Sequence, residues 1–161
     1  NFDSLNIQFS TCCIDFRNNK VLLTNKGEHL KEFAIASASI PLVFENYVID
    51  GVEYVDGGLR NNFPIEPLID AKCDLIIGIN VINFTPSECT VSKKNAAFHA
   101  YTIIEEELSR EKFKKCDYYI PIKELNSNKL SPVSFKKYLK IYQIGYEYTK
   151  AYIASHPEMK K

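Results

Sequence analysis

The stretch of sequence that decides the fold is VDGGLRNNFP, residues 55–64. An apolar segment ends here in Asp56, which is followed by Gly57, Gly58 and a polar turn. Strands of α/β proteins present catalytic and binding carboxylates at the carboxyl edge of the sheet in this way. Asp56 is therefore the first candidate for a catalytic residue. Because Asp and Gly are also common turn residues for steric reasons, an ordinary turn is the alternative interpretation.

The composition predicts one soluble globular unit over residues 1–161. A chain of 161 residues with 45% hydrophobic residues can bury one ordinary core. Twenty basic and twenty acidic residues give a net charge of zero, so no overall field attracts nucleic acid or an anionic membrane. We therefore expect no nucleic-acid partner, and any contact with a charged surface has to be local.

The cysteines and the first residue bear on the cellular compartment. The five cysteines lack the C-x-x-C spacing of zinc and redox sites, and they are Cys12, Cys13, Cys73, Cys89 and Cys116. We expect free thiols in a reducing, cytoplasmic compartment, with no metal and no cofactor. The longest apolar run, residues 75–82, is too short to span a bilayer. Because the sequence opens on Asn1, we expect a processed or truncated chain whose targeting signals are lost.

Two hairpins are predicted upstream of Asp56. Apolar and polar residues alternate from Ile7 to Phe16, and residues 21–24 form the returning strand. The second hairpin covers residues 47–55 around Asp50-Gly51, a pair that suits the positive φ angles of a tight turn. Between the hairpins, helical spacing predicts a helix from Glu28 to about Ala38, which Pro41 stops.

Helices and strands alternate downstream of Asp56. Residues 64–71 predict a short helix with Pro64 as its first residue, and residues 74–82 predict a strand buried on both faces of a parallel sheet. A loop over residues 83–95 and a helix over 96–115 follow, with apolar residues at Ala97, Tyr101, Ile104 and Leu108. This alternation predicts an α/β layer protein, although the strands are few for a complete sheet.

A short strand and a long helix are predicted at the carboxyl end. Residues 118–122 form a short strand, for which Pro121 indicates either an edge position or an end at that residue, and residues 126–129 form a loop. The helix packs on the body by one apolar stripe, which consists of Phe135, Leu139, Tyr142, Tyr146, Thr149 and Ile153. We expect the lysines outside this stripe to face solvent. The alternative is that they make a peripheral contact with lipid headgroups.

The sequence contains no recognisable nucleophile that could form a catalytic pair with Asp56. The sequence contains neither the G-x-S-x-G turn of serine hydrolases nor a Gly-rich phosphate loop. The three histidines, His29, His99 and His156, lie outside Gly-rich loops and strand ends. Ser37 and Ser39 stand among small residues that favour close helix packing, and a hydrolase that uses one of them is a third interpretation.

Three linked motifs resemble the second half of patatin-like phospholipases. They are ASASIPLVF at 36–44, IDGVEYVDGG at 49–58 and NNFP at 61–64. That family typically shows A-S-x-x-I-P-x-x-F, an I-D-G hairpin, Y-V-D-G-G and N-x-P in this order. Residues 75–81, 117–121 and 144–146 also look like bacterial members, so the resemblance covers nearly the whole chain.

The resemblance implies a three-layer α/β/α domain with a mainly parallel central sheet. It implies a lipid acyl hydrolase, of phospholipase A or esterase type, that acts on a phospholipid or acyl ester through a Ser–Asp dyad without histidine. The aspartate of the family's D-G-G motif is the base, which corresponds to Asp56, while Gly57 and Gly58 shape the turn. A carboxylate partly screened from water can accept the serine proton directly.

One departure from the family limits what these residues are expected to do. The family's G-x-S-x-G serine and its Gly-rich oxyanion loop lie upstream of the region matched here, and neither occurs in this sequence. We therefore expect a missing amino-terminal half to supply the nucleophile, and the 161-residue chain to be inactive by itself. The alternative is a catalytically inactive fragment or pseudoenzyme that serves as an interaction domain.

Overall fold

The computed structural model describes residues 1–161 except 42, 82–95, 123–136 and 161. The loops predicted over residues 83–95 and 126–129, together with Cys89 and Phe135, lie outside the described residues. The chain divides into two compact units. The first contains Asn1–Asp74 and Glu107–Lys112, and the second contains Leu75–Glu106 and Phe113–Lys161.

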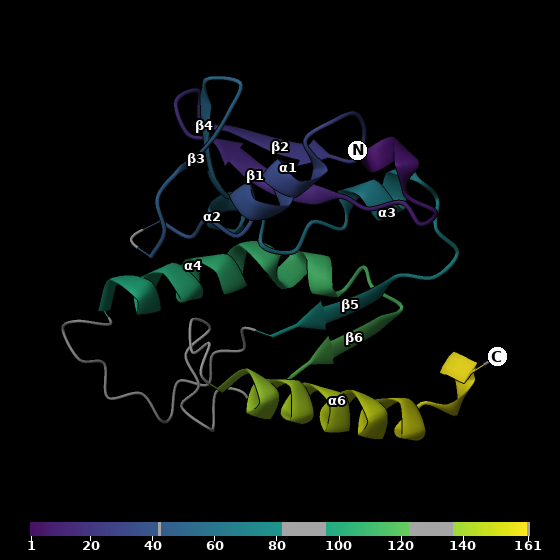
Figure 1. Ribbon diagram of the computed structural model, residues 1–161. Coiled ribbons are helices and arrows are strands. Elements are labelled where there is room, and N and C mark those ends of the chain that lie inside the picture. The colour runs from purple at the N-terminus through teal and green to yellow at the C-terminus, as the bar shows by residue number, and fades with distance from the viewer. Residues whose placement is uncertain (42, 82–95, 123–136, 161) are drawn as a thin grey trace. The chain divides into compact units, whose positions relative to one another are not determined.

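The first unit is built on a four-stranded antiparallel sheet with the order β2-β1-β4-β3 (Figure 1). Its strands are β1 (Thr11–Asp15), β2 (Lys20–Thr24), β3 (Tyr47–Ile49) and β4 (Val52–Asp56). Both predicted hairpins are confirmed. At the tip of the second, Asp50 and Gly51 have φ angles of 48° and 78°, as the tight turn requires.

The first predicted strand is wrong in its amino-terminal part. A short 3-10 helix, η1 (Phe2–Ser4), opens the chain, and Ile7 is almost fully exposed. The strand begins only at Thr11, which pairs with Thr24. Thr24 is the last residue of β2, so the residues before Thr11 have no residue of β2 to pair with. Apolar and polar residues that alternate without a neighbouring strand do not form a strand.

Helix α1 (Leu30–Ala36) covers one face of this sheet. It ends at Ala36, earlier than predicted and before Pro41 is reached, so Pro41 is not the residue at which it stops. Two serine hydroxyls donate to carbonyl groups of its last turn: Ser37 to Ala34 (2.9 Å) and Ser39 to Ile35 (3.0 Å). The core beneath α1 is formed by the buried Cys13, Ala36 and Ile49, against which Leu22, Phe33, Tyr47 and Tyr54 pack.

Two short helices follow β4, and only one of them was expected. The polar turn after Asp56 contains one helical turn, α2 (Gly58–Asn61). The second helix, α3 (Glu66–Asp70), begins after Ile65, so the prediction that Pro64 is its first residue is wrong. Pro67 instead lies in the first turn of α3. Backbone N–H groups have no partner within the helix there, so proline loses no hydrogen bond by lacking one.

The second unit contains a parallel pair of strands, β5 (Ile77–Asn80) and β6 (Tyr118–Pro121). The parallel pairing and the end of β6 at Pro121 confirm the predictions. Burial of β5 on both faces is wrong, because Gly78 and Asn80 are buried whereas Ile77 and Ile79 are about half exposed. Within the described residues, only one face of β5 is covered.

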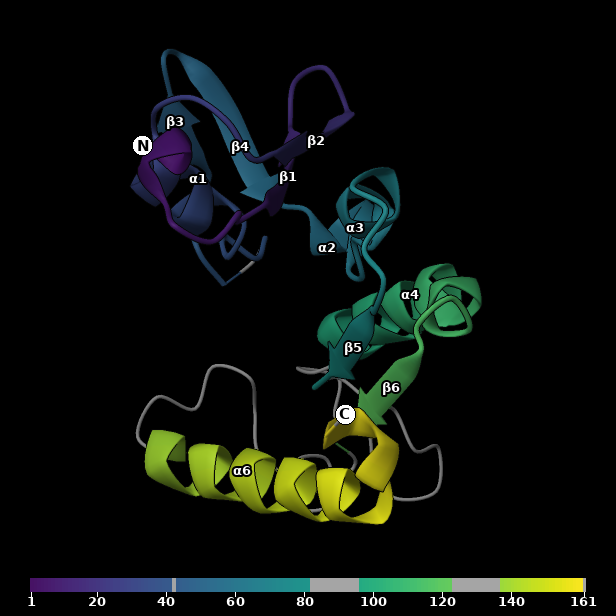
Figure 2. The ribbon, with the colours of Figure 1, turned by 90° about the vertical axis from the view of Figure 1, so that its right-hand side faces the viewer.

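Two long helices and a final short one complete the second unit, α4 (Ala96–Phe113), α6 (Tyr138–Ser155) and η3 (Pro157–Lys160). Helix α6 runs beside β6 (Figure 2). It packs against the buried Ile120 and Ile122 through Ile141, Ile144, Tyr148 and Tyr152. Residues 107–112 of α4 belong to the first unit.

The extent of α4 agrees with the prediction, whereas the packed face of α6 does not. On α6 the predicted stripe is exposed at Leu139, Tyr142 and Tyr146. On α4, Ile104 and Leu108 are about half exposed, and the buried positions are Thr102, Glu105 and Ser109. Apolar residues stand at helical spacing on more than one face of α6, so periodicity identifies the helix without choosing the face that packs.

Candidate functional site

Asp56 is the last residue of β4 and is held by neighbours on both sides. It pairs with Cys13 across the ladder between β1 and β4. Its backbone N–H donates to the carbonyl oxygen of Ser39, just after α1, at 3.0 Å. The structure thus places the predicted carboxylate where the centre of the sheet, the end of α1 and the start of α2 meet.

The side chain of Asp56 is partly buried and folds back on its own turn. Its Oδ1 accepts a hydrogen bond of 2.7 Å from the backbone N–H of Gly58. Burial raises the pKa of this carboxyl group, and the Gly58 hydrogen bond opposes that rise without cancelling it. A carboxylate with a raised pKa holds a proton more strongly, which is the property that a general base requires.

Gly57 lies so close to β1 that no other residue fits. A Cβ atom on Gly57 would lie 2.4 Å from Sγ and 2.5 Å from the carbonyl oxygen of Cys12. Gly58 is buried and supplies the amide that binds Asp56. The two glycines therefore have separate roles in the turn: one permits close approach to the neighbouring strand, and the other orients the carboxylate.

The two cysteines beside Asp56 remain protonated thiols. Burial, with the nearby Asp56 carboxylate adding to it, raises the pKa of Cys12 to about 11. Burial likewise raises the pKa of Cys13 to about 12. Because a cysteine attacks as its thiolate, neither residue is suited to be a nucleophile near neutral pH.

The serines nearest in sequence to the site are also occupied. The hydroxyls of Ser37 and Ser39 donate to carbonyl groups of α1, and Ser39 is buried. Within the described ranges, the Gly58 amide is the hydrogen-bond donor to the Asp56 carboxylate. The hydroxyl bonds of Ser37 and Ser39 agree with their interpretation as packing residues and give no support to a serine nucleophile at either position.

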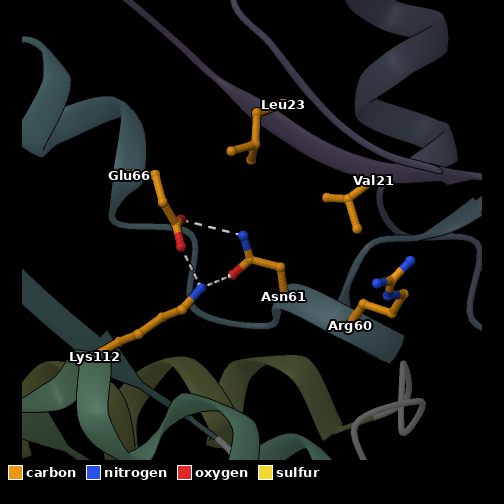
Figure 3. Close-up of a pocket in the computed structure, with 6 residues that line it drawn as sticks. All are labelled: Val21, Leu23, Arg60, Asn61, Glu66 and Lys112. Atoms are coloured by element: carbon orange, nitrogen blue, oxygen red, sulfur yellow. Dashed lines mark hydrogen bonds and ion pairs between the residues drawn. The ribbon is translucent and has the colours of Figure 1, made fainter.

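A second polar cluster lines an open hollow of about 420 Å³ in the first unit (Figure 3). The lining residues are Val21, Leu23, Arg60, Asn61, Glu66 and Lys112. The Lys112 ammonium group donates to Asn61 and Glu66, and Asn61 Nδ2 donates to Glu66 Oε2 at 3.2 Å. Burial favours a higher pKa for Glu66, but the hydrogen bonds from Lys112 and Asn61 outweigh it and lower the pKa.

This cluster was not predicted from the sequence. Glu66 and Lys112 are separated by more than forty positions and carry no motif, so only the fold brings them together. Asp56 does not line the hollow, but α2 connects the two places, since it begins two residues after Asp56 and ends at Asn61. The cluster therefore fixes the far end of the turn that carries the carboxylate.

The histidines that the structure describes take part in local contacts. His29 lies 3.3 Å from the exposed carboxylate of Asp50. His156 follows the last residue of α6, with Nδ1 2.9 Å from the Tyr152 carbonyl oxygen and 3.0 Å from the Ser155 hydroxyl. The side chain of His99 lies outside the described residues.

A comparison with known protein families bears on the turn at Asp56. Residues 14–69 match the family model described as Patatin-like phospholipase. The match begins within β1 and ends within α3, so it contains the whole Asp56 turn, the second hairpin and the later part of the first. It supports the resemblance over about a third of the chain. The resemblance of later segments, the bacterial type and the place of this chain within the domain stay predictions.

Within the described parts of the chain, no helix combines the length and apolar character needed to cross a bilayer. Among the same residues, no three His, Cys, Asp or Glu side chains gather as a set of metal ligands would.

Proposed function

We propose that this protein is a lipid acyl hydrolase that cleaves ester bonds of phospholipids or related acyl lipids. The observation that carries the proposal is the family match over residues 14–69, which contains an aspartate at a strand end. It is followed by Gly57, which has no room for a side chain, and by Gly58, whose amide binds the carboxylate. In this proposal Asp56 is the general base that takes the proton of a serine hydroxyl. The serine and the oxyanion donors come from an amino-terminal half of the same patatin-like domain, which has a mainly parallel central sheet in three layers.

The geometry of Asp56 suits this role in three ways. One carboxylate oxygen is fixed by the Gly58 amide, which leaves the other oxygen to face an incoming hydroxyl. Partial burial raises the pKa and so strengthens the base. The absence of a side chain at Gly57 lets the turn lie directly against Cys12 of the neighbouring strand. A rigid carboxylate is what proton transfer over one hydrogen bond needs.

The proposal extends to location and partners. The substrate is a phospholipid or acyl ester, and the protein works in the cytoplasm with a peripheral contact to membranes. No cofactor is required, because the carboxylate and a serine hydroxyl together complete the proton transfer and the attack on the ester carbonyl.

The test is ester hydrolysis by the full-length protein and by its Asp56→Asn variant. Asparagine keeps the oxygen that accepts the Gly58 N–H, so the turn is preserved while the base is lost. We expect kcat to fall at least a hundredfold, within the range of general-base catalysis of about 10² to 10⁴. p-Nitrophenyl esters of short acyl chains provide a soluble substrate for the assay.

The matched control is Asp70→Asn, which removes an exposed carboxylate at the end of α3. Its kcat should equal that of the unmodified protein. Full activity of Asp56→Asn would refute the base role. Absence of ester hydrolysis in the unmodified full-length protein would refute the hydrolase proposal and favour an interaction domain on the same fold.

A further inference from the structure

Helix α6 carries large apolar side chains on two separate faces. One face packs against β6 and the residue that follows it through Ile141, Ile144, Tyr148 and Tyr152. The other face, called the α6 stripe below, consists of Tyr138, Leu139, Tyr142 and Tyr146. These four side chains are between 51% and 66% exposed, although each is large enough to be a core residue. Among the residues that the structure describes, none of its own unit therefore covers the α6 stripe.

The composition of the α6 stripe is that of a boundary between water and hydrocarbon. Three of its four members are tyrosines, and half of the ten tyrosines of the chain lie in α6. The rings of Tyr142 and Tyr146 stack with centroids 6.2 Å apart. A protein interface without water would have to supply hydrogen-bond partners for three buried tyrosine hydroxyls. In the headgroup region of a bilayer, the hydroxyls stay hydrated while the rings insert among apolar groups.

The charge of this end of the chain complements an anionic surface. The whole chain is neutral, but residues 137–161 contain five lysines and two glutamates. Three of those lysines, Lys137, Lys140 and Lys150, are exposed on or beside α6. The Lys150 ammonium group lies 5.8 Å from the centre of the Tyr146 ring, at the edge of the α6 stripe. Long lysine side chains can place their charge at headgroups while the stem covers apolar surface.

We propose that the α6 stripe is the docking face for an anionic lipid bilayer. Helix α6, about 27 Å long at 1.5 Å per residue, lies flat in the headgroup region with the stripe toward the acyl chains and its lysines among the phosphates. This deepens the proposed function and rests on it, because the bilayer is the form in which a phospholipid substrate occurs. Other exposed apolar positions, such as Ile104 and Leu108 of α4, have no comparable group of tyrosines beside lysines.

The chain contains no tryptophan, so one introduced tryptophan reports its own surroundings. Tyr142→Trp places the probe in the α6 stripe, and Gln143→Trp places it on the polar side of the same helix. With vesicles of phosphatidylcholine and phosphatidylglycerol in equal parts, we expect a blue shift for Tyr142→Trp and quenching by brominated acyl chains. Gln143→Trp should show neither effect to a comparable extent.

Sedimentation with the same vesicles measures the contribution of each part. Tyr142→Ser combined with Tyr146→Ser should weaken binding about tenfold or more, since two aromatic rings no longer leave water. The matched control, Ile104→Ser with Leu108→Ser, changes exposed apolar residues of α4 and should leave binding unchanged. Lys140→Glu with Lys150→Glu should weaken binding to anionic vesicles by at least about fivefold per lysine and should abolish the preference over phosphatidylcholine alone.

Three results would overturn the proposal. One is the absence of a blue shift for Tyr142→Trp with anionic vesicles, and another is equal binding by the double-serine variant. The third is a dimer that the double-serine variant converts to monomers, which would assign the stripe to a second copy of the chain. Failure of the proposed function is separable, because Asp56→Asn should lose ester hydrolysis and keep vesicle binding. Conversely, the double-serine variant should keep hydrolysis of soluble esters.

Discussion

The turn over residues 56–58 and helix α6 are packed to opposite degrees. At Gly57 there is no room for a single methyl group, because Cys12 of the neighbouring strand already occupies the space. On α6, four large side chains remain more than half exposed. Tight packing fixes a carboxylate relative to its sheet, whereas the open face retains apolar area for a contact outside the unit. One chain thus uses two kinds of packing for two proposed tasks, chemistry and recognition of a surface.

Replacing Gly57 with alanine should give the largest effect on stability. The new Cβ would lie 2.5 Å from the backbone oxygen of Cys12, and a backbone atom of a central strand cannot move without disturbing the ladder. We expect the free energy of unfolding to fall by about 3 kcal/mol, as for severe overpacking. Urea denaturation followed by circular dichroism measures the change.

The control for that experiment is a glycine-to-alanine substitution in helix α6. A Cβ on Gly145, in α6, would meet its nearest neighbour, Ile122 Cδ1, at an ordinary 3.9 Å. Gly145→Ala should therefore stabilise the helix by roughly 0.5–1 kcal/mol. If Gly57→Ala were tolerated as well as Gly145→Ala, the turn would not be as tightly packed as described.

Removing the Lys112 ammonium group should give the next largest effect. Lys112→Met keeps much of the side-chain volume but leaves Glu66 without its cation, at an expected loss of about 1 kcal/mol for this partly exposed pair. Because the pKa of Glu66 is lowered in the folded state, the stabilisation is present above its ordinary value of 4.5 and is lost as pH falls through the folded value.

Unfolding at several pH values checks the sign of this effect. The difference between Lys112→Met and the unmodified chain should shrink in acid. A double-mutant cycle with Glu66→Gln isolates the pairwise energy. A coupling energy of zero would show that the cluster does not stabilise the end of α2.

Asp56→Asn should act on stability in the opposite direction to its effect on catalysis. Burial raises the pKa of Asp56, so the folded state favours the protonated form. The associated stability is fully present below the ordinary pKa of 3.8 and is lost as pH rises through the raised folded value. At neutral pH, Asp56→Asn should therefore unfold at a slightly higher urea concentration than the unmodified chain.

The pH series again supplies the check. Below pH 3.8 the two proteins should have the same midpoint, because both then carry a neutral side chain at residue 56. A variant that is less stable at neutral pH would mean that the ionised carboxylate is stabilised by its surroundings and does not lie in a place that disfavours charge.

The smallest effect on stability is expected for the α6 stripe itself. Tyr142→Ser removes an exposed ring, so the free energy of unfolding should change by no more than about 0.5 kcal/mol. A loss as large as that of Gly57→Ala would show that the ring is buried in solution, which would also remove the basis for a docking face.

Local signals in the sequence predicted the surroundings of Asp56 well. The Asp50-Gly51 pair determines a tight turn by its positive φ angles, and that turn positions the strand that ends in Asp56. Backbone sterics of this kind act within a few residues and can therefore be read from a single sequence. The requirement for glycine at residue 57 could not be predicted from local sequence, because the atoms that would clash with a side chain there belong to Cys12 on another strand.

Non-local packing accounts for the failed predictions. Alternation around Ile7 is a strand pattern, but the register of β1 with β2 ends at Thr11 and Thr24. On α6, apolar residues recur at helical spacing both on the packed face and on the exposed stripe. Periodicity therefore does not predict which of the two packs against β6. The contact between Glu66 and Lys112 depends on how residues 107–112 pack within the first unit, which no local pattern records.

The strand order β2-β1-β4-β3 has a consequence for the order of events in folding. Each hairpin closes over a short loop, so each can form early and by itself, on the microsecond scale of isolated hairpins. The ladder between Cys13 and Asp56 joins residues about forty positions apart and costs more loop entropy. We therefore expect the two hairpins to meet after each has formed, and Asp56 to come beside Cys13 only in that step.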